Sequence, residues 1–232
     1  ISAGTLKLGA MGAIPDSSSV TVTGTLDLNG KAETIAGISG TGRITSTAAG
    51  TPVLTIGGNN ASSSFSGQIE NGIATSVGIT KIGSGVLTLS GTNTFTGPVI
   101  VNGGGLTLAN GVAIHDSVAV TLSASGVALT LSGSETIGSL SAVAGTTVAL
   151  GSNTLTLGSS DSTAIAGVIS GSGGSIDKVG SGTLTLSGTN TYSGATVVTA
   201  GALKLSNANV LSTDSALTIH GTLDLNGYSH TI

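Results

Sequence analysis

The sequence contains few charged residues and almost no aromatic ones. Only 7% of its 232 residues are charged, against roughly 25% in typical soluble domains. Aromatic residues make up 2% of the chain, and tryptophan is absent. Six basic residues spread over the whole chain cannot neutralise a phosphate backbone. We therefore exclude nucleic acid as a partner.

Cysteine and long apolar runs are also missing. Without cysteine no disulfide can staple the chain, so packing and hydrogen bonds must hold it together. No apolar run approaches the ~18 residues of a membrane-spanning helix, and we expect no direct membrane insertion by this segment. The residues that follow Ile1 already belong to a repeat, so we expect a fragment of a longer protein without a secretion signal of its own.

What remains is a mixture of glycine, serine, threonine and aliphatic residues. Hydrophobic residues make up 38% of the chain, which argues against intrinsic disorder in spite of 39 glycines. β-Branched residues favour strands, and glycine favours turns. The composition therefore predicts an all-β protein in which no long segment is helical.

The sequence repeats itself over a long period. Residues 178–205 read KVGSGTLTLSGTNTYSGATVVTAGALKL, and residues 81–108 read KIGSGVLTLSGTNTFTGPVIVNGGGLTL. A partial copy, ISAGTLKL, occupies residues 1–8. Self-similarity at a spacing of about 97–100 residues indicates stacked copies of one structural unit. We expect residues 1–232 to form a single continuous solenoid.

A shorter period lies within the long one. Triplets of leucine, a polar residue and leucine recur, many of them 19 to 23 residues apart. In such a triplet the two leucines lie on one face of a strand and the middle residue on the other. The triplets are Leu6–Leu8, Leu26–Leu28, Leu87–Leu89, Leu106–Leu108, Leu129–Leu131, Leu184–Leu186, Leu203–Leu205 and Leu223–Leu225.

Two or three short strands per ~20 residues, returning to the same triplet, describe one turn of a parallel β-solenoid. We expect about eleven or twelve such turns. The alternative is a β-sandwich or an up-and-down barrel, because Asn-Gly pairs typical of hairpin turns are present. A sandwich, however, does not need the same triplet every ~20 residues. The pairs are Asn29-Gly30, Asn71-Gly72, Asn102-Gly103, Asn110-Gly111 and Asn226-Gly227.

Both full copies resemble the autotransporter-associated β-strand repeat, found in passenger regions of type V secreted bacterial surface proteins. The resemblance is carried by GVLTLSGTNTFTG at residues 85–97 and GTLTLSGTNTYSG at residues 182–194. Each is followed by a short valine strand and Gly-x-Leu-x-Leu. FSGQI at residues 65–69, echoed by IAGVI at residues 165–169, looks like the segment that precedes this motif in the family.

The resemblance implies a right-handed parallel β-helix that is extracellular, either attached at the bacterial cell surface or secreted. It also implies a C-terminal translocator barrel, which lies outside this fragment. We interpret the chain as a structural stalk segment that displays a distal domain. Turns that fold one after another outside the cell would also aid export, because a folded turn cannot slip back through the pore.

Two other functions stay open. The first is an adhesin whose solenoid face binds host or sister-cell molecules, and the second is an enzyme that acts on polysaccharide. A long inserted loop rich in acidic or aromatic residues would favour either one. The longest irregular stretch, residues 57–85, offers only Phe65, Glu70 and Lys81. We therefore rank the stalk first and predict no enzymatic activity.

Residue types that could carry chemistry are present but not grouped. His115-Asp116-Ser117 places the types of a catalytic triad side by side, but a triad needs convergence in space. His220 and His230 have no second histidine or carboxylate at metal-ligand spacing. We predict polar turns or surface positions here, and no catalytic, cofactor-binding or metal-binding residue and no cofactor.

Two further patterns carry little chemistry. The acidic residues are scattered, mostly one to a turn, whereas polysaccharide-cleaving β-helices need clustered carboxylates. GSGGSID at residues 171–177 lacks the tandem copies of a calcium-binding repeat and the Lys-Ser/Thr of a phosphate loop, so we predict a turn there. The acidic residues are Asp16, Asp27, Glu33, Glu70, Asp116, Glu135, Asp161, Asp177, Asp214 and Asp224.

Asn93 and Asn190 occupy equivalent places in the two Thr-Asn-Thr segments. An asparagine side chain can satisfy the backbone groups of a turn, and we predict that role for both. Phe95 and Tyr192 follow at equivalent positions. We expect their rings to cap a corner of the solenoid, because four aromatic residues cannot form a sugar-stacking row.

The triplets also predict the register between turns. Lys7 should lie beside Asp27, and Thr185, Lys204 and Asp224 should form one column, with two exposed ion pairs worth only ~0–1 kcal/mol each. Ile232 aligns with Ile35, and neither end of the chain shows a polar cap. We therefore expect bare end turns that support head-to-tail self-association.

Overall fold

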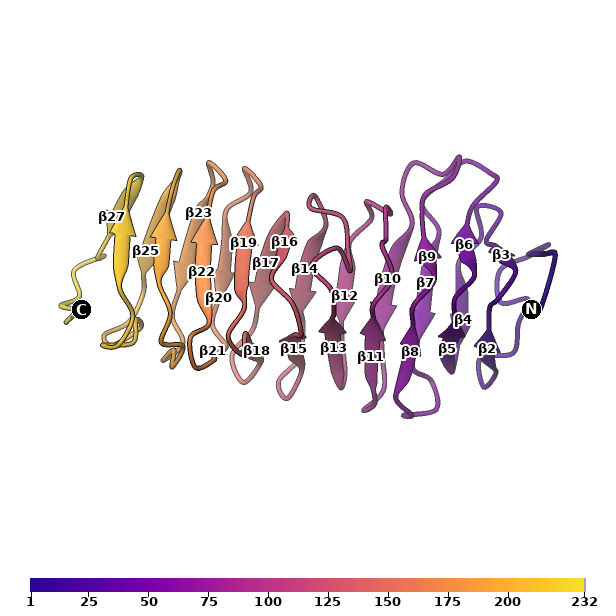
Figure 1. Ribbon diagram of the computed structural model, residues 1–232, viewed down its shortest axis with the longest axis horizontal. Helices are drawn as coiled ribbons and strands as arrows, with labels where there is room; N and C mark the ends of the chain where they lie inside the picture. The colour runs from indigo at the N-terminus through magenta and orange to yellow at the C-terminus, as the bar shows by residue number, and fades with distance from the viewer. Residues whose placement is uncertain (232) are drawn as a thin grey trace.

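Strands run across the long axis of the molecule, and the two termini lie at its opposite ends (Figure 1). This computed structural model describes residues 1–231, which form a parallel β-solenoid of about eleven turns. Those residues contain no helix, and therefore none that could cross a membrane. The aligned residue Ile232 lies outside the described residues.

The strands pair in parallel from one turn to the next. The predicted parallel solenoid is thereby confirmed, and the sandwich alternative is wrong. Asn29 and Asn226, which could have marked hairpins, have a positive φ of 49° and 51° and lie in turns that join no antiparallel strands. An Asn-Gly pair thus marks a corner here as readily as it marks a hairpin.

Three faces run along the solenoid, and we name them A, B and C. Face C is a ten-stranded sheet. Its strands are β4 (Glu33–Ile35), β7 (Val53–Ile56), β10 (Gly78–Lys81), β12 (Val99–Val101), β14 (Ala119–Leu122), β17 (Ser139–Ala142), β20 (Thr163–Ile165), β23 (Thr183–Leu186), β25 (Ala202–Leu205) and β27 (Thr222–Asp224).

Face B is an eight-stranded sheet. Its strands are β2 (Ser19–Thr21), β5 (Gly37–Gly40), β8 (Ser63–Phe65), β11 (Val86–Leu89), β13 (Gly105–Leu108), β15 (Ala128–Leu131), β18 (Thr147–Ala149) and β21 (Val168–Ser170).

Face A consists of two sheets, joined by segments that are not strands. The first sheet is β1 (Thr5–Lys7), β3 (Thr25–Asp27), β6 (Arg43–Thr45) and β9 (Gln68–Ile69). The second is β16 (Glu135–Ile137), β19 (Thr154–Leu157), β22 (Ser175–Lys178), β24 (Thr196–Val198) and β26 (Leu217–Ile219). In each turn the chain passes face A, then face C, then face B, as in β3, β4 and β5.

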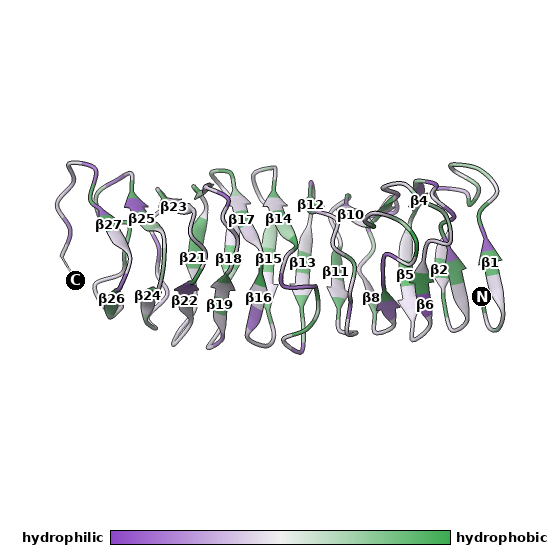
Figure 2. Ribbon diagram, turned by 90° about the horizontal axis from the view of Figure 1, so that it is seen from above, coloured by the Kyte–Doolittle hydropathy of each residue, from purple (hydrophilic) through white to green (hydrophobic). Residues whose placement is uncertain are grey.

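The leucine triplets build the core. Leu89, Leu108, Leu186 and Leu205 are all fully buried, while the middle residues of their triplets are half-buried on the outside. Along the ribbon, strongly hydrophilic colour is confined to short, scattered stretches (Figure 2). The predicted inward leucines and outward middle residues are therefore confirmed.

The predicted register is confirmed as well. Lys7 pairs with Asp27, Thr185 pairs with Lys204, and Lys204 pairs with Asp224. Lys204 Nζ lies 3.6 Å from the Asp224 carboxylate, with both side chains exposed.

The triplets do not all return to the same place in the turn, however. The triplet strands β1 and β3 lie on face A, β11, β13 and β15 lie on face B, and β23, β25 and β27 lie on face C. The idea that one triplet position defines every turn is therefore wrong. A spacing near 20 residues fixes the length of a turn, but it does not fix where a turn begins.

Candidate functional site: buried polar side chains that join the turns

His115, Asp116 and Ser117 form a surface turn. His115 Nδ1 lies 2.9 Å from Ser117 Oγ and accepts a hydrogen bond from Ser117 N at 3.2 Å. In the next long repeat Ser212 Oγ accepts from Asp214 N at 3.3 Å in the same way. A serine thus takes the place of the histidine, which identifies His115 as an acceptor within a turn.

The other candidate residues also stay apart. His220 is exposed and His230 is partly buried. Residues 171–174 form the expected turn, after which β22 begins. Across residues 1–231 no three histidine or acidic side chains group as a metal site would require. The absence of catalytic, cofactor and metal residues remains a prediction.

The polar groups that the fold does bring together are buried and lie between turns. Lys81, the first residue of the first motif copy, is buried on face C. Its Nζ donates to three carbonyl oxygens, those of Ile82 at 2.6 Å, Gly83 at 3.1 Å and Gly103 at 3.4 Å. Burial lowers the pKa of Lys81. The ammonium therefore ties its own corner to the corner of the next turn.

Lys178 repeats this arrangement on face A. Its Nζ donates to the carbonyl oxygens of Gly180 at 2.5 Å and Ala200 at 3.3 Å, and burial lowers the pKa of Lys178 too. Gly201 lies against the ammonium with φ +69°, and a Cβ there would meet the carbonyl oxygen of Gly182 at 2.3 Å. The corner therefore needs glycine both for its conformation and for its close approach.

Asn93 carries the hydrogen-bond ladder of face A through a turn that has no strand. Its Oδ1 accepts from Ile69 N at 2.6 Å, and its Nδ2 donates to Ala113 O at 2.7 Å. Asn190 does the same on face B, between Ile169 N and Val210 O, both at 2.8 Å. The predicted pairing of both asparagines with backbone groups is confirmed, and it spans three turns.

Phe95 and Tyr192 are fully buried. The predicted corner caps are therefore core residues, although the expectation that they form no exposed row holds. The Tyr192 hydroxyl lies 2.5 Å from Thr196 Oγ1, which in turn lies 3.2 Å from Ser215 Oγ. Burial raises the pKa of Tyr192, and these hydroxyl contacts oppose that rise.

Glu135, in the first strand of face A after its strandless part, bonds back to the strandless turn before it. Its carboxylate accepts from Ala113 N at 3.3 Å and from Ile114 N at 3.1 Å. Glu33 accepts from Ala13 N at 2.9 Å and from Ile14 N at 3.3 Å, one long repeat earlier. Burial raises the pKa of the Glu135 carboxyl against the effect of the two amides.

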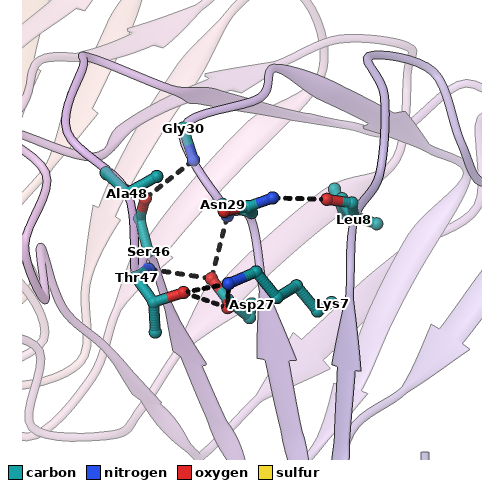
Figure 3. Close-up of polar contacts among 8 residues, drawn as sticks. All are labelled: Lys7, Leu8, Asp27, Asn29, Gly30, Ser46, Thr47 and Ala48. Atoms are coloured by element: carbon teal, nitrogen blue, oxygen red, sulfur yellow. Dashed lines mark hydrogen bonds and ion pairs between the residues drawn. The ribbon is translucent and has the colours of Figure 1, made fainter.

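Asp27 is the centre of a polar cluster that joins three turns near the N-terminal end (Figure 3). Its carboxylate accepts from Thr47 N at 2.8 Å, from Thr47 Oγ1 at 2.5 Å and from Asn29 N at 2.8 Å. Lys7 Nζ lies 3.7 Å away and donates to Thr47 Oγ1 at 2.9 Å. The prediction of an exposed Lys7–Asp27 pair is wrong for the aspartate, because the following turn covers it.

The partners of Asp27 decide its charge state. Burial by itself would raise the pKa of the carboxyl, but the Thr47 and Asn29 hydrogen bonds and the Lys7 charge outweigh burial and lower it. Asn29 Nδ2 also donates to Leu8 O at 2.9 Å, so the cluster reaches back to the first turn. Such a cluster holds three neighbouring turns together.

The buried charges were missed at the level of sequence because lysine and glutamate usually lie at the surface. Strand alternation offered a signal. Lys81 lies two residues after the buried Ile79, and Glu135 lies two residues before the buried Ile137. Residues two apart on a strand point to the same side, so both belong to the inner face.

Both full copies of the long repeat match a known family of repeats. A family model described as the passenger-associated-transport-repeat matches residues 79–108 and 176–205. The "Adhesin BmaC autotransporter" of Brucella suis biovar 1 (strain 1330) is 37% identical over 84 residues. That alignment covers 36% of this chain and 2% of the relative, so the chain spans only a small fraction of that protein. No solved structure matches the chain.

The two matched ranges cover equivalent structural units. Residues 79–108 run from the second residue of β10 to the end of β13 and include Lys81 and Asn93. Residues 176–205 run from the second residue of β22 to the end of β25 and include Lys178 and Asn190. These two units of the chain are passenger-associated-transport-repeats of the autotransporter type.

Proposed function

We propose that this chain is a stalk segment of an autotransporter passenger, placed at the cell surface or in a secreted product, where it holds a distal domain away from the cell. The observation that carries the proposal is the use of its buried polar groups. Six buried side chains bond to backbone groups of their own or neighbouring turns: Lys81, Lys178, Asn93, Asn190, Glu33 and Glu135. These contacts join neighbouring turns into one continuous rod, which supports a structural role for the segment.

The same contacts support a role in export by stepwise folding. Asn93 bonds to residues 24 positions before it and 20 positions after it, and the longer Lys81 contact spans 22 positions. Each of these hydrogen bonds can therefore form as soon as one more turn of the chain has left the export pore. Because such contacts need little loop closure, a turn could lock outside the cell while the rest of the chain is still in transit.

Deletion of one whole repeat tests the stalk. In a passenger that contains this chain, deletion of residues 109–205 removes one long repeat and joins Leu108 to Ser206, the residue that follows the equivalent Leu205. We expect the passenger to reach the surface and its distal domain to stay active. The deletion removes about four and two-thirds turns of the solenoid. At ~4.8 Å per turn, the distance that the passenger reaches from the cell should shorten by about 22 Å. Loss of the distal activity without loss of export would contradict the stalk.

An adhesive role is the second candidate, and it is favoured by the similarity to the Brucella suis adhesin. In that case the purified 232-residue chain should itself bind host cells and compete with the intact passenger. The deletion of residues 109–205 should then reduce adhesion while export continues. A chain that neither binds nor competes would leave the stalk as the only one of the two roles.

A further inference from the structure

Three long segments without strands recur along the chain, and they are copies of one loop. We name them loop 1 (residues 8–18), loop 2 (residues 109–118) and loop 3 (residues 206–216). Each contains the same turn, in which an amide bonds to the carbonyl three residues earlier. These bonds run from Ser18 to Pro15 at 2.8 Å, from Val118 to His115 at 2.9 Å and from Ser215 to Ser212 at 3.1 Å.

Each loop takes the place of a strand, and each does so on a different face. Loop 1 follows β1 on face A and lies where face C would continue, beneath Glu33 of β4. Loop 2 follows β13 on face B and lies on face A, beneath Glu135 of β16. Loop 3 follows β25 on face C and lies on face B, where Val210 bonds to Asn190.

The reason is the length of the long repeat. Leu8, Leu108 and Leu205 are the last residues of equivalent triplets and are 100 and 97 residues apart. From β1 to β13, and again from β13 to β25, the chain makes fourteen steps from face to face. Three steps complete a turn, so each copy advances by four and two-thirds turns. Every copy therefore begins one face further round the axis.

Because of this rotation, the positions at which a face lacks a strand fall on different faces along the solenoid. On face A, residues 90–98 and loop 2 leave two consecutive turns without a strand, while β10, β12 and β14 continue on face C and β11, β13 and β15 continue on face B. On face B, residues 187–195 and loop 3 leave two turns without a strand. There the ladders β22–β24–β26 and β23–β25–β27 continue on the other faces.

We propose that the long repeat is a staggered joint, in which each copy shifts its interruption to the next face so that two of the three sheets are continuous at every level. If the long repeat were a whole number of turns, all turns without a strand would lie on one face. That face would then lack a continuous hydrogen-bond ladder along the whole rod. With the stagger, the whole solenoid unfolds as one cooperative unit. Its use in bearing load rests on the proposed stalk function, but the joint itself is a property of this chain.

A matched pair of proline variants in the 232-residue chain tests the joint. Thr121 in β14 and Thr55 in β7 both point outward on face C and pair with the turns below and above. Proline removes a ladder hydrogen bond. Thr121→Pro breaks a second face where face A is already interrupted, whereas Thr55→Pro breaks one face where β3, β6 and β9 remain paired on face A and β5, β8 and β11 on face B.

We expect Thr121→Pro to unfold in two steps, with protease cleavage between residues 90 and 118 at least ~10-fold faster than in Thr55→Pro, because local opening becomes accessible there. Thr55→Pro should keep a single transition at a lower denaturant midpoint. Should a proline variant fail to fold, Thr121→Gly and Thr55→Gly provide the milder pair, read by amide hydrogen exchange in loop 2. Equal behaviour of the two members of a pair would overturn the staggered joint, while leaving the tests of stalk and adhesion unaffected.

Discussion

The first passenger repeat, residues 79–108, and the second, residues 176–205, make the same contacts on different faces of one solenoid. Lys81 and Lys178 bind carbonyl oxygens of the next corner, and Asn93 and Asn190 bridge the turns before and after them. The contacts of a repeat are therefore local. They depend on the turns directly before and after it, and not on the face of the solenoid that it occupies.

The two repeats differ in one pocket. In the second repeat the buried Tyr192 hydroxyl meets Thr196 and Ser215. In the first repeat the equivalent positions hold Phe95, Val99 and Val118, all buried. Two of these positions are 4 residues apart and the third lies 19 residues further on, yet all three change together from apolar to polar. A buried hydroxyl is accepted only where its partners are supplied with it.

The largest effect should come from the inward leucines, and it should be equal in the two repeats. Leu89→Ala and Leu186→Ala each leave a cavity in a fully buried site, which costs ~2–5 kcal/mol. Thr88→Ala and Thr185→Ala, on the outer side of the same strands, serve as controls. Urea unfolding of the four variants measures the difference. A loss confined to one repeat would show that the two are not equivalent.

Removal of the bridging asparagines should come next. Asn93→Ala leaves the amide of Ile69 and the carbonyl of Ala113 buried without their partner, and each unpaired group costs ~1–3 kcal/mol. Asn190→Ala should match it. Chemical denaturation gives the loss, and hydrogen exchange at Ile69 or Ile169 locates it. Variants as stable as the parent chain would mean that water replaces the side chain at no cost.

The aromatic pocket provides the sharpest contrast between the repeats. Phe95→Tyr places a hydroxyl between Val99 and Val118 and should cost ~1–3 kcal/mol. Adding Val99→Thr and Val118→Ser should restore most of that loss, because the three side chains then form the hydrogen bonds of Tyr192, Thr196 and Ser215. A thermodynamic cycle over these variants measures the coupling. Purely additive effects would contradict the account of the pocket.

The buried lysines predict a pH dependence. Burial lowers the pKa of Lys81 and Lys178 below the usual 10.5, so the folded chain releases these protons at lower pH than the unfolded chain. The free energy of unfolding should therefore rise as the pH increases through the folded pKa toward 10.5.

The double variant Lys81→Met, Lys178→Met should flatten this rise, whereas Lys204→Met, at an exposed site, should not. Denaturant midpoints measured up to pH ~10, where tyrosine begins to ionise, check the prediction. A fall in stability over this range in the parent chain would contradict it.

The smallest effects belong to the histidines and to the aspartate beside one of them. His115→Ala, Asp116→Ala and His220→Ala change exposed side chains and should each alter stability by no more than ~0.5 kcal/mol. Thermal unfolding and a cell-binding assay together check this. A large loss of stability or binding in any of the three would reveal a site at that position.

Much of this fold could be predicted from the sequence, because strand alternation and turn residues act locally. The inward leucines and the pairing of Lys204 with Asp224 follow from the triplet alone. Of the polar contacts, the backbone-binding role of Asn93 and Asn190 was also predictable, since asparagine is suited to it.

The arrangement round the axis could not be predicted in the same way. Copies about 100 residues apart describe a whole number of turns or a fraction equally well, because the length of each corner varies. Asp27 shows the same limit. It is the middle residue of its triplet and points outward, yet Thr47 from the next turn covers it. Contacts made by a neighbouring turn are not contained in the strand's own pattern.

One cross-linking measurement tests the central claim that the second repeat lies one face away from the first. Thr185 pairs with Ala164 on face C. If the triplets of both repeats shared face B, Thr185 would instead continue the column of Thr130, Ala149 and Ser170. Cysteines on neighbouring parallel strands are ~4.8 Å apart and within disulfide reach. We predict that Ala164→Cys with Thr185→Cys forms a disulfide readily and that Ser170→Cys with Thr185→Cys does not; the reverse result would contradict the rotation of the repeats.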